Sequence, residues 1–146
     1  MKSFLTLKKT PLIKWGSLPN NTFFEGKLPE GYSLAVCPGE YIVLDVDRHG
    51  DVNGFSNLPP LIHAELLDTY QYKTKNNGKH YWFKYTGDKV LANKASGQGI
   101  DLRVGYKGYV VYYPAKDGDD IRKHVDEIQE TSVELNLWLE KLFSYK

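Results

Sequence analysis

The sequence predicts an α+β fold, with a mostly antiparallel sheet of about six strands and flanking helices. Short runs rich in β-branched and aromatic residues alternate with turns rich in Gly, Pro, Asn and Asp, which is typical of strands joined by short connections. An Asn-Asn-Gly turn at 76–78 separates two such runs, and a long amphipathic segment lies near the end of the chain. The length of 146 residues suits one domain, which we expect to span 1–146.

The first strands are predicted around a Pro-Gly turn. Residues 17–31 are dominated by Pro, Asn and Gly and predict irregular chain. Residues 32–37 (YSLAVC) predict a short strand, and residues 41–47 (YIVLDVD) predict the strongest strand, after the turn at Pro38-Gly39. Because five residues of this strand are apolar, we expect it to be central and covered on both faces.

The middle of the chain predicts a loop, a short helix and a hairpin. Residues 48–60 are rich in Gly, Asn, Asp and Pro and predict a loop. Residues 61–67 predict about two helical turns. Residues 69–75 and 79–85 then predict two antiparallel strands joined by the turn at 76–78.

The last third predicts a second hairpin and the longest helix. After a polar connection at 88–97, residues 100–104 and 109–113 predict two strands around the glycine-containing turn at 105–108. Residues 132–143 carry a broad apolar stripe at helical spacing and predict an α-helix. We expect this helix to pack on the sheet.

Charge and cysteine content narrow the classes of partner. The net charge is +1, so no global field indicates a polyanionic partner. Between residues 69 and 94, six lysines are interleaved with Tyr and Trp, which suits a phosphate backbone and stacked bases. The alternative is a solvated edge hairpin, because lysines also protect sheet edges. The single cysteine, Cys37, excludes an internal disulfide and a cysteine zinc cluster.

The N-terminal segment MKSFLTLKKTPLIKW is interrupted by charge and lacks the apolar core of a signal peptide. No window of the sequence approaches the length and apolarity of a membrane span. We therefore expect no membrane partner and a cytoplasmic location.

Two carboxylates lie at the end of the strongest predicted strand. The period of 2 places Asp45 and Asp47 on one face, opposite the aliphatic residues between them. Two unpaired carboxylates on a buried strand are costly, and a divalent cation such as magnesium or manganese would compensate them. The alternative is that both aspartates cap the turn at His49-Gly50, since Asp is an ordinary turn residue.

Two further polar side chains lie within predicted strands. Asp101 shares its strand face with Arg103, so it either belongs to a site or pairs with that arginine. His80 follows Gly78 and Lys79 and offers a donor to phosphate oxygens, although a lone strand histidine is more often a structural residue. Three carboxylates and a phosphate donor on strands form the set that two-metal nucleotidyl transfer requires.

The segments LDVDRHG, GKHYWF and GIDLR, in this order and spacing, resemble the three motifs of the archaeo-eukaryotic primase superfamily, in particular the bifunctional primase-polymerase domain of phages and plasmids. The resemblance begins at PLIKW, continues through GYKGYVVYYP and reaches ELNLWLEKLF, so it covers nearly the whole chain. It implies a catalytic core related to the RNA-recognition fold, with the active site on the open face of the sheet.

The resemblance also implies the activity and the metal ligands. The activity would be template-dependent nucleotidyl transfer in DNA replication, that is primer synthesis, DNA polymerisation or both, with Mg²⁺ or Mn²⁺ as cofactor. Asp45, Asp47 and Asp101 would be the catalytic residues that ligate the metal.

The same resemblance implies the contacts to the substrates, which would be nucleoside triphosphates and a DNA template and primer. His80 would lie at the rim of the site and contact the phosphates of the incoming nucleotide. Lys79, Gly78 and Arg103 would be further nucleotide or template contacts.

The sequence also departs from the family pattern. The region before the first motif is shortened, one cysteine allows no zinc-binding stem, and the second motif has a single glycine where members often have two. We therefore expect template capture and strand opening to need other chains, including a replicative helicase supplied in trans. Two alternatives are a degenerate module that binds single-stranded nucleic acid or nucleotide without catalysis, and a phosphohydrolase with Asp45 as nucleophile.

Overall fold

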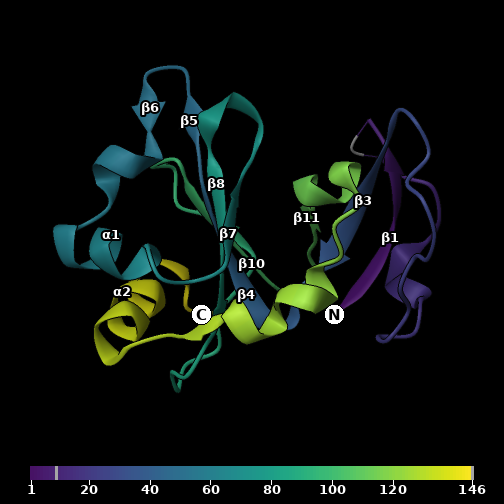
Figure 1. Cartoon of the computed structure of the whole chain (residues 1–146). Helices are drawn as coiled ribbons and strands as arrows, with labels where there is room; N and C mark the ends of the chain where they lie inside the picture. The colour runs from purple at the N-terminus through teal and green to yellow at the C-terminus, as the bar shows by residue number, and fades with distance from the viewer. Residues whose placement is uncertain (9, 146) are drawn as a thin grey trace.

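Two sheets and a pair of α-helices form three layers (Figure 1). The structure is a computed structural model that describes residues 1–8 and 10–145. The larger sheet is the middle layer, with the α-helices on one of its faces and the smaller sheet beyond the other. The predicted α+β class is confirmed, whereas a relation of this core to the RNA-recognition fold stays a prediction.

The larger sheet has the strand order β12-β8-β4-β10-β9, with β7 paired to β8. In chain order its strands are β4 (Gly39–Val46), β7 (Gln71–Lys73), β8 (Lys79–Lys84), β9 (Lys94–Ala95), β10 (Ile100–Gly105) and β12 (Gln129–Glu130). These pairs are antiparallel except that of β12 with β8, which is parallel. Strand β4 therefore lies between two strands that come from much later in the chain.

The smaller sheet has the order β11-β3-β1-β2 and is antiparallel. Its strands are β1 (Lys2–Leu7), β2 (Thr10–Pro11), β3 (Tyr32–Cys37) and β11 (Val110–Val111). A separate short hairpin consists of β5 (Arg48–His49) and β6 (Val52–Asn53). The α-helices are α1 (Pro60–Leu66) and α2 (Val133–Phe143), and short 3₁₀ segments are η1 (Trp15–Ser17), η2 (Gly54–Asn57), η3 (Lys75–Asn77), η4 (Tyr113–Asp117) and η5 (Ile121–Glu127).

Strand β4 is covered on both faces, as its apolar composition predicts. Every second residue, Ile42, Leu44 and Val46, packs in the core beneath the two α-helices. The alternate residue Val43 packs in a second core between the two sheets, together with Trp82. Each fully buried aliphatic side chain of this kind contributes about 1.5–3 kcal/mol.

Helix α2 begins at a capped residue that also joins it to α1. Ser132 accepts a hydrogen bond at its side chain from the backbone N–H of Leu135, at 3.1 Å. Glu65 of α1 accepts in turn from the Ser132 backbone N–H at 3.0 Å and from its hydroxyl. The Glu65 carboxylate therefore lies at the N-terminus of α2, where the helix dipole favours a negative charge.

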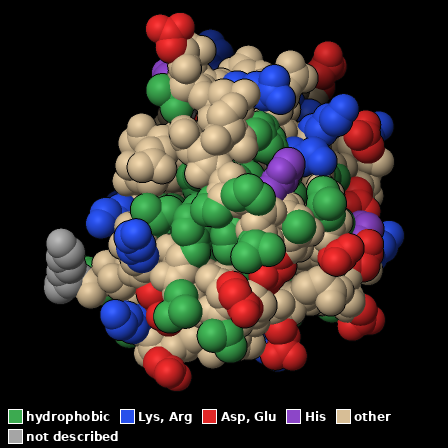
Figure 2. All heavy atoms as spheres, turned by 90° about the vertical axis from the view of Figure 1, so that its left-hand side faces the viewer, with side chains coloured by type: hydrophobic (Ala, Val, Ile, Leu, Met, Phe, Trp, Pro, Cys, Tyr) green, Lys and Arg blue, Asp and Glu red, His purple; other side chains and the backbone are tan. Residues whose placement is uncertain are grey.

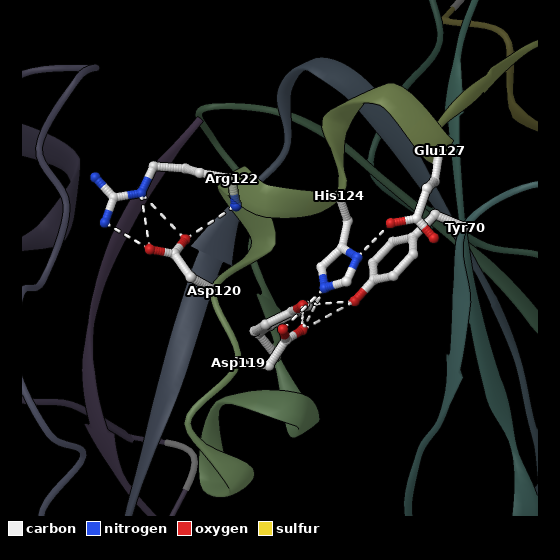
Figure 3. A network of polar contacts seen from close by, with 7 residues as sticks. Tyr70, Asp119, Asp120, Arg122, His124 and Glu127 are labelled. Carbon is white, nitrogen blue, oxygen red and sulfur yellow. Dashed lines mark hydrogen bonds and ion pairs between the residues drawn. The ribbon is translucent and has the colours of Figure 1, made fainter.

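A polar network ties η5 to the ends of β7 and β11 (Figure 3). The His124 ring lies between two acids, with Nε2 2.8 Å from Asp119 Oδ1 and Nδ1 2.5 Å from Glu127 Oε2. Tyr70 stacks on that ring, and the Tyr112 hydroxyl donates to Asp119 at 2.5 Å. Because Tyr70 precedes β7 and Tyr112 follows β11, the network connects both sheets.

Several sequence predictions are confirmed. Strand β3 spans the predicted residues 32–37, and β7 and β8 form the predicted hairpin with η3 at its tip. Helices α1 and α2 lie within one residue of the predicted 61–67 and 132–143 segments at each end.

The prediction of a single sheet and a second hairpin is wrong. Residues 109–113 do not pair with β10, because β11 pairs with β3 of the smaller sheet. The chain leaves the larger sheet at Gly105, which has a φ of +65° and a register shift beside it. Asn93 holds the departing end by accepting from Val104 N at 2.8 Å and donating to Val104 O at 3.1 Å.

Strand β1 and the β5–β6 hairpin are among the elements that were not predicted. Strand β1 pairs with all six residues of β3, although its own sequence shows no clean alternation. The loop predicted at 48–60 contains the β5–β6 hairpin and η2. Both depend on partners outside their own segment, so local patterns give little sign of them.

The face formed by the α-helices carries exposed apolar side chains, which gather in the centre of the view in Figure 2. They include Leu61 and Leu67 at the two ends of α1 and Val133 and Leu137 on α2, with 64–77% of each exposed. None of the helices in the described part of the chain has the length and apolarity needed to cross a membrane.

Candidate active site

Three polar side chains lie in a row across the centre of the larger sheet. Asp45 on β4 is the direct cross-strand partner of Asp101 on β10 and, on its other side, of His80 on β8. Direct partners in an antiparallel pair lie on the same face with Cβ atoms roughly 4.5–5.5 Å apart. This face points toward the smaller sheet, because Val43 and Trp82, its next row, pack in the core between the sheets.

Asp47 lies one residue beyond the end of β4, at a point where two loops cross. Its backbone N–H donates to Gly99 O at 2.8 Å, and its carbonyl accepts from Gly54 N at 2.8 Å. A Cβ on Gly54 would lie 2.1 Å from Gly99 O, so larger residues do not fit at this crossing. The crossing therefore fixes the backbone of Asp47 from both sides.

Gly78 makes room for the Asp47 side chain. A Cβ added to Gly78 would lie 2.9 Å from Asp47 Oδ1 and 2.8 Å from Val46 O. Its φ of −80° is open to any residue, so the glycine is required by space and not by backbone strain. In the structure Gly78 thus lies beside the Asp47 carboxylate, while its predicted contact with nucleotide stays a prediction.

The carboxylates repel one another. Burial, followed by the charge of Asp45, raises the pKa of Asp47, and a backbone hydrogen bond from Arg48 opposes the rise. Burial and then Asp45 also raise the pKa of Asp101, against the opposing charge of Arg103. A cation between these groups would remove the repulsion that raises both pKa values.

The donor chemistry fits a hard divalent cation such as Mg²⁺ or Mn²⁺, which prefers carboxylate oxygens. Within residues 1–8 and 10–145, however, no group of three or more His, Cys, Asp and Glu side chains is arranged so that it could hold a metal ion. Metal binding at Asp45, Asp47 and Asp101 would therefore require side-chain rotations toward a common point.

His80 lies beside Asp45 on the neighbouring strand, and it is more buried than a residue at the rim of the site, where it was predicted to lie. Its residue surface is 4% exposed, and its Nε2 lies 3.5 Å from Asp45 Oδ2. Its Nδ1 lies 3.0 Å from the Tyr72 hydroxyl. His80 is still among the residues that line the cavity described next, and its contact with phosphate stays a prediction.

A cavity of about 440 Å³ opens beside this row, between the two sheets. Its floor includes Asp45, His80 and Arg103 of the larger sheet. Its wall includes Lys107 and Tyr113, which follow β10 in the chain. The cavity thus combines one carboxylate with two cations, which suits a bound group with several negative charges.

A second hollow, of about 330 Å³, lies at the end of β4. Asp47 and Asp101 line it together with His49 and several small residues. The predicted acids are therefore divided between neighbouring openings, with Asp45 facing the larger and the other two facing the smaller.

The residues of the cavity wall were not predicted from the sequence. Lys107 and Tyr113 lie in the segment GYKGYVVYYP, and Trp15 of the same cavity ends the segment PLIKW. Both segments belong to the family resemblance, but neither carries a charged pattern that marks a site. Burial and then the charge of Asp45 raise the pKa of Tyr113, which is consistent with its place near the acids.

Lys79 and Arg103 are the other two predicted nucleotide or template contacts, and of these Arg103 lines the cavity whereas Lys79 does not. Lys79 has the opposite strand parity to His80, and its Nζ donates to Gln71 Oε1 at 2.9 Å and lies 6.0 Å from the Tyr81 ring. It therefore points to the helix side of the sheet and does not join the row. Arg103 lines the cavity and donates from Nη1 to the Leu102 carbonyl at 3.0 Å.

Comparison with known proteins adds the family. The family described as "Bifunctional DNA primase/polymerase, N-terminal" matches residues 8–137, a range that includes the row of polar side chains and every cavity residue named above. A comparison with curated proteins finds no match. Because the match covers most of the 146 residues, the chain belongs to the bifunctional DNA primase/polymerase family.

Proposed function

We propose that this chain catalyses template-dependent nucleotidyl transfer, adding nucleotides to the 3′ end of a primer with Mg²⁺ or Mn²⁺. The observation that carries the proposal is the row of Asp101, Asp45 and His80 beside a cavity that also contains Arg103 and Lys107. Family membership supports DNA and nucleoside triphosphates as the substrates.

Asp45, Asp47 and Asp101 would hold the metal. When bound, the cation would supply stabilisation for the negative charge of the triphosphate and for the attacking 3′ oxygen. The carboxylates are held on adjacent strands and at a rigid loop crossing, so little backbone motion is needed to bring them together. Such preorganisation lowers the cost of reaching the reactive geometry.

The cavity would bind the nucleotide. Arg103 and Lys107 would pair with its phosphate oxygens, because guanidinium and ammonium groups form strong charge-assisted hydrogen bonds. Trp15 and Tyr113 offer aromatic surfaces on which a base could stack. Nucleotide binding would then involve one strand of the larger sheet and the segments that adjoin strands of the smaller sheet.

Nucleic acid would run past the tips of two neighbouring hairpins. Arg48 and His49 on β5 and Lys73 and Lys75 near the β7–β8 turn are exposed, and η3 lies against β5. These side chains are close in the chain to Asp47 and Gly78, so a strand held by them would approach the acids. Contacts to phosphates of this kind position a strand without reading its sequence.

Primer extension tests the proposal. The isolated chain, a labelled primer-template, Mg²⁺ or Mn²⁺ and either ribonucleotides or deoxynucleotides should give extended products. Asp45→Asn should abolish extension, whereas Asp88→Asn, which removes an exposed charge elsewhere, should not. Absence of extension by the wild-type chain under all four conditions would refute the catalytic proposal.

A module that binds nucleic acid or nucleotide without catalysis is the second candidate. It is favoured by the lack of a ready metal-holding group among the described residues. Clear binding of single-stranded DNA or nucleotide together with no extension would select this candidate over the first.

A further inference from the structure

The side chains of Trp82, Tyr72 and His80 form a continuous chain of hydrogen bonds. Tyr72 on β7 is the direct cross-strand partner of His80, and Trp82 follows His80 by two residues on the same face of β8. Trp82 Nε1 lies 3.0 Å from the Tyr72 hydroxyl oxygen, which lies 3.0 Å from His80 Nδ1. The Tyr72 and His80 rings also meet edge to face, with centroids 5.3 Å apart.

The direction of the first bond is fixed by chemistry. An indole N–H can only donate, so the Tyr72 oxygen accepts from Trp82. Trp82 is fully buried and has no access to water as an alternative acceptor. Leaving this N–H without a partner would cost about 1–3 kcal/mol.

The direction of the second bond follows from the first. Tyr72 has one hydroxyl hydrogen, and burial raises its pKa well above the ordinary value, so the hydrogen is retained. Within the described residues its hydroxyl has no hydrogen-bond partner besides Trp82 and His80. If His80 Nδ1 carried a hydrogen, the hydroxyl hydrogen of Tyr72 would have no acceptor. His80 Nδ1 therefore accepts the hydrogen bond that the Tyr72 hydroxyl donates.

We propose that Tyr72, itself oriented by Trp82, is a positioning residue that holds His80 in the tautomer in which Nδ1 accepts a hydrogen bond and Nε2 carries the hydrogen. The other side of the ring supports this assignment independently. His80 Nε2 lies 3.5 Å from Asp45 Oδ2, where an N–H is attracted to the carboxylate and a lone pair would be repelled.

The tautomer determines what His80 offers to the cavity. With hydrogen on Nε2, the ring presents a donor to Asp45 and to the space beside it. The other tautomer would present a lone pair, which repels both a carboxylate and a phosphate. The use of this donor for a nucleotide phosphate rests on the proposed function, whereas the tautomer itself does not.

Nitrogen NMR of the imidazole rings at a fixed pH tests the assignment without any ligand. His80 should show a protonated Nε2 and an unprotonated Nδ1, and His80→Gln identifies its signals among those of the four histidines. Tyr72→Phe should move the two nitrogen shifts toward each other, because both tautomers become populated. Tyr70→Phe, whose hydroxyl bonds to Tyr112 and not to His80, is the matched control and should leave them unchanged.

A protonated Nδ1 in the wild-type protein would overturn the proposal, and so would unchanged His80 shifts in folded Tyr72→Phe. The wild-type spectrum decides the question even if that variant does not fold. Nucleotide titration then separates this inference from the proposed function. Tyr72→Phe should weaken nucleoside triphosphate binding about tenfold, the loss expected from one hydrogen bond to a charged group. Wild-type protein that shows the Nε2–H tautomer but binds no nucleotide would support the tautomer and refute the proposed function.

Discussion

Replacing Asp101 by Asn should stabilise the metal-free protein and at the same time remove a proposed metal ligand. Asp101 is half-buried and directly opposite Asp45, and its pKa is raised by burial and then by that neighbouring charge. A raised carboxyl pKa means that the folded state binds the proton more tightly than the unfolded state. The ionised carboxylate therefore destabilises the fold as the pH rises through the ordinary carboxyl range and then through the raised pKa.

The size of the effect follows from the register. Like charges on directly opposite strand residues cost roughly 0.2–1 kcal/mol per pair. Asp101 is repelled by Asp45 and, more weakly, by Asp47, while Arg103 partly compensates. Asp101→Asn should therefore gain about 1 kcal/mol at neutral pH, which raises the Tm of a domain of this size by roughly 2–4 °C.

Thermal melts with and without Mn²⁺ give the measurement. A ligand at one hundred times its Kd stabilises the state that binds it by about 2.7 kcal/mol, so Mn²⁺ should raise the Tm of the wild type. The variant lacks one carboxylate and should gain much less, which reverses the order of the two proteins. Asp88→Asn, an exposed substitution, should show neither effect.

Two outcomes would refute this reasoning. A metal-free variant less stable than the wild type would mean that Asp101 is a structural partner of Arg103, the alternative that its strand position left open. Equal stabilisation of both proteins by Mn²⁺ would mean that Asp101 is not a ligand.

Four further measurements test other parts of the structure. Lys107→Ala should weaken nucleoside triphosphate binding about tenfold in a titration, through loss of one charge-assisted contact, whereas Lys79→Ala, on the helix side of the sheet, should not. Binding of single-stranded DNA should fall with salt, with a slope of log K against log salt of roughly −2 to −3 if three or four cations contact phosphates. Ser132→Ala should lower the free energy of unfolding by about 1 kcal/mol in a denaturant titration, because α2 loses its cap. Hydrogen bonding to Asp119 raises the pKa of His124, so the stability lost in His124→Gln should be greatest at mildly acidic pH and should vanish as the pH rises through the raised pKa.

The elements with strong local patterns were predictable from the sequence. The Asn-Asn-Gly turn identified the β7–β8 hairpin, and the alternation in β4 assigned its two faces correctly. Such patterns depend on neighbours in the chain, which a single sequence contains.

The division into two sheets was not predictable in the same way. Residues 109–113 have the composition of a strand, but their partner is β3, which lies more than seventy residues earlier. The chain turns toward β3 at Gly105, which has a positive φ. From the sequence alone, a glycine in a turn is equally consistent with a tight hairpin. The contribution of Lys107 to the cavity depends on that crossing, so it could not be inferred from spacing alone.

The row of Asp101, Asp45 and His80 is formed by strands whose order in the sheet is β10, β4 and β8. Pairing β4 with both neighbours requires two long loops to close, which is slow because the entropy of closure must be lost before the contacts form. A partly folded chain or a fragment that lacks any one of the three strands cannot contain the site. If the proposed function holds, nucleotide binding would report that all three strands have assembled, and a ligand bound at the row would stabilise the larger sheet by mass action.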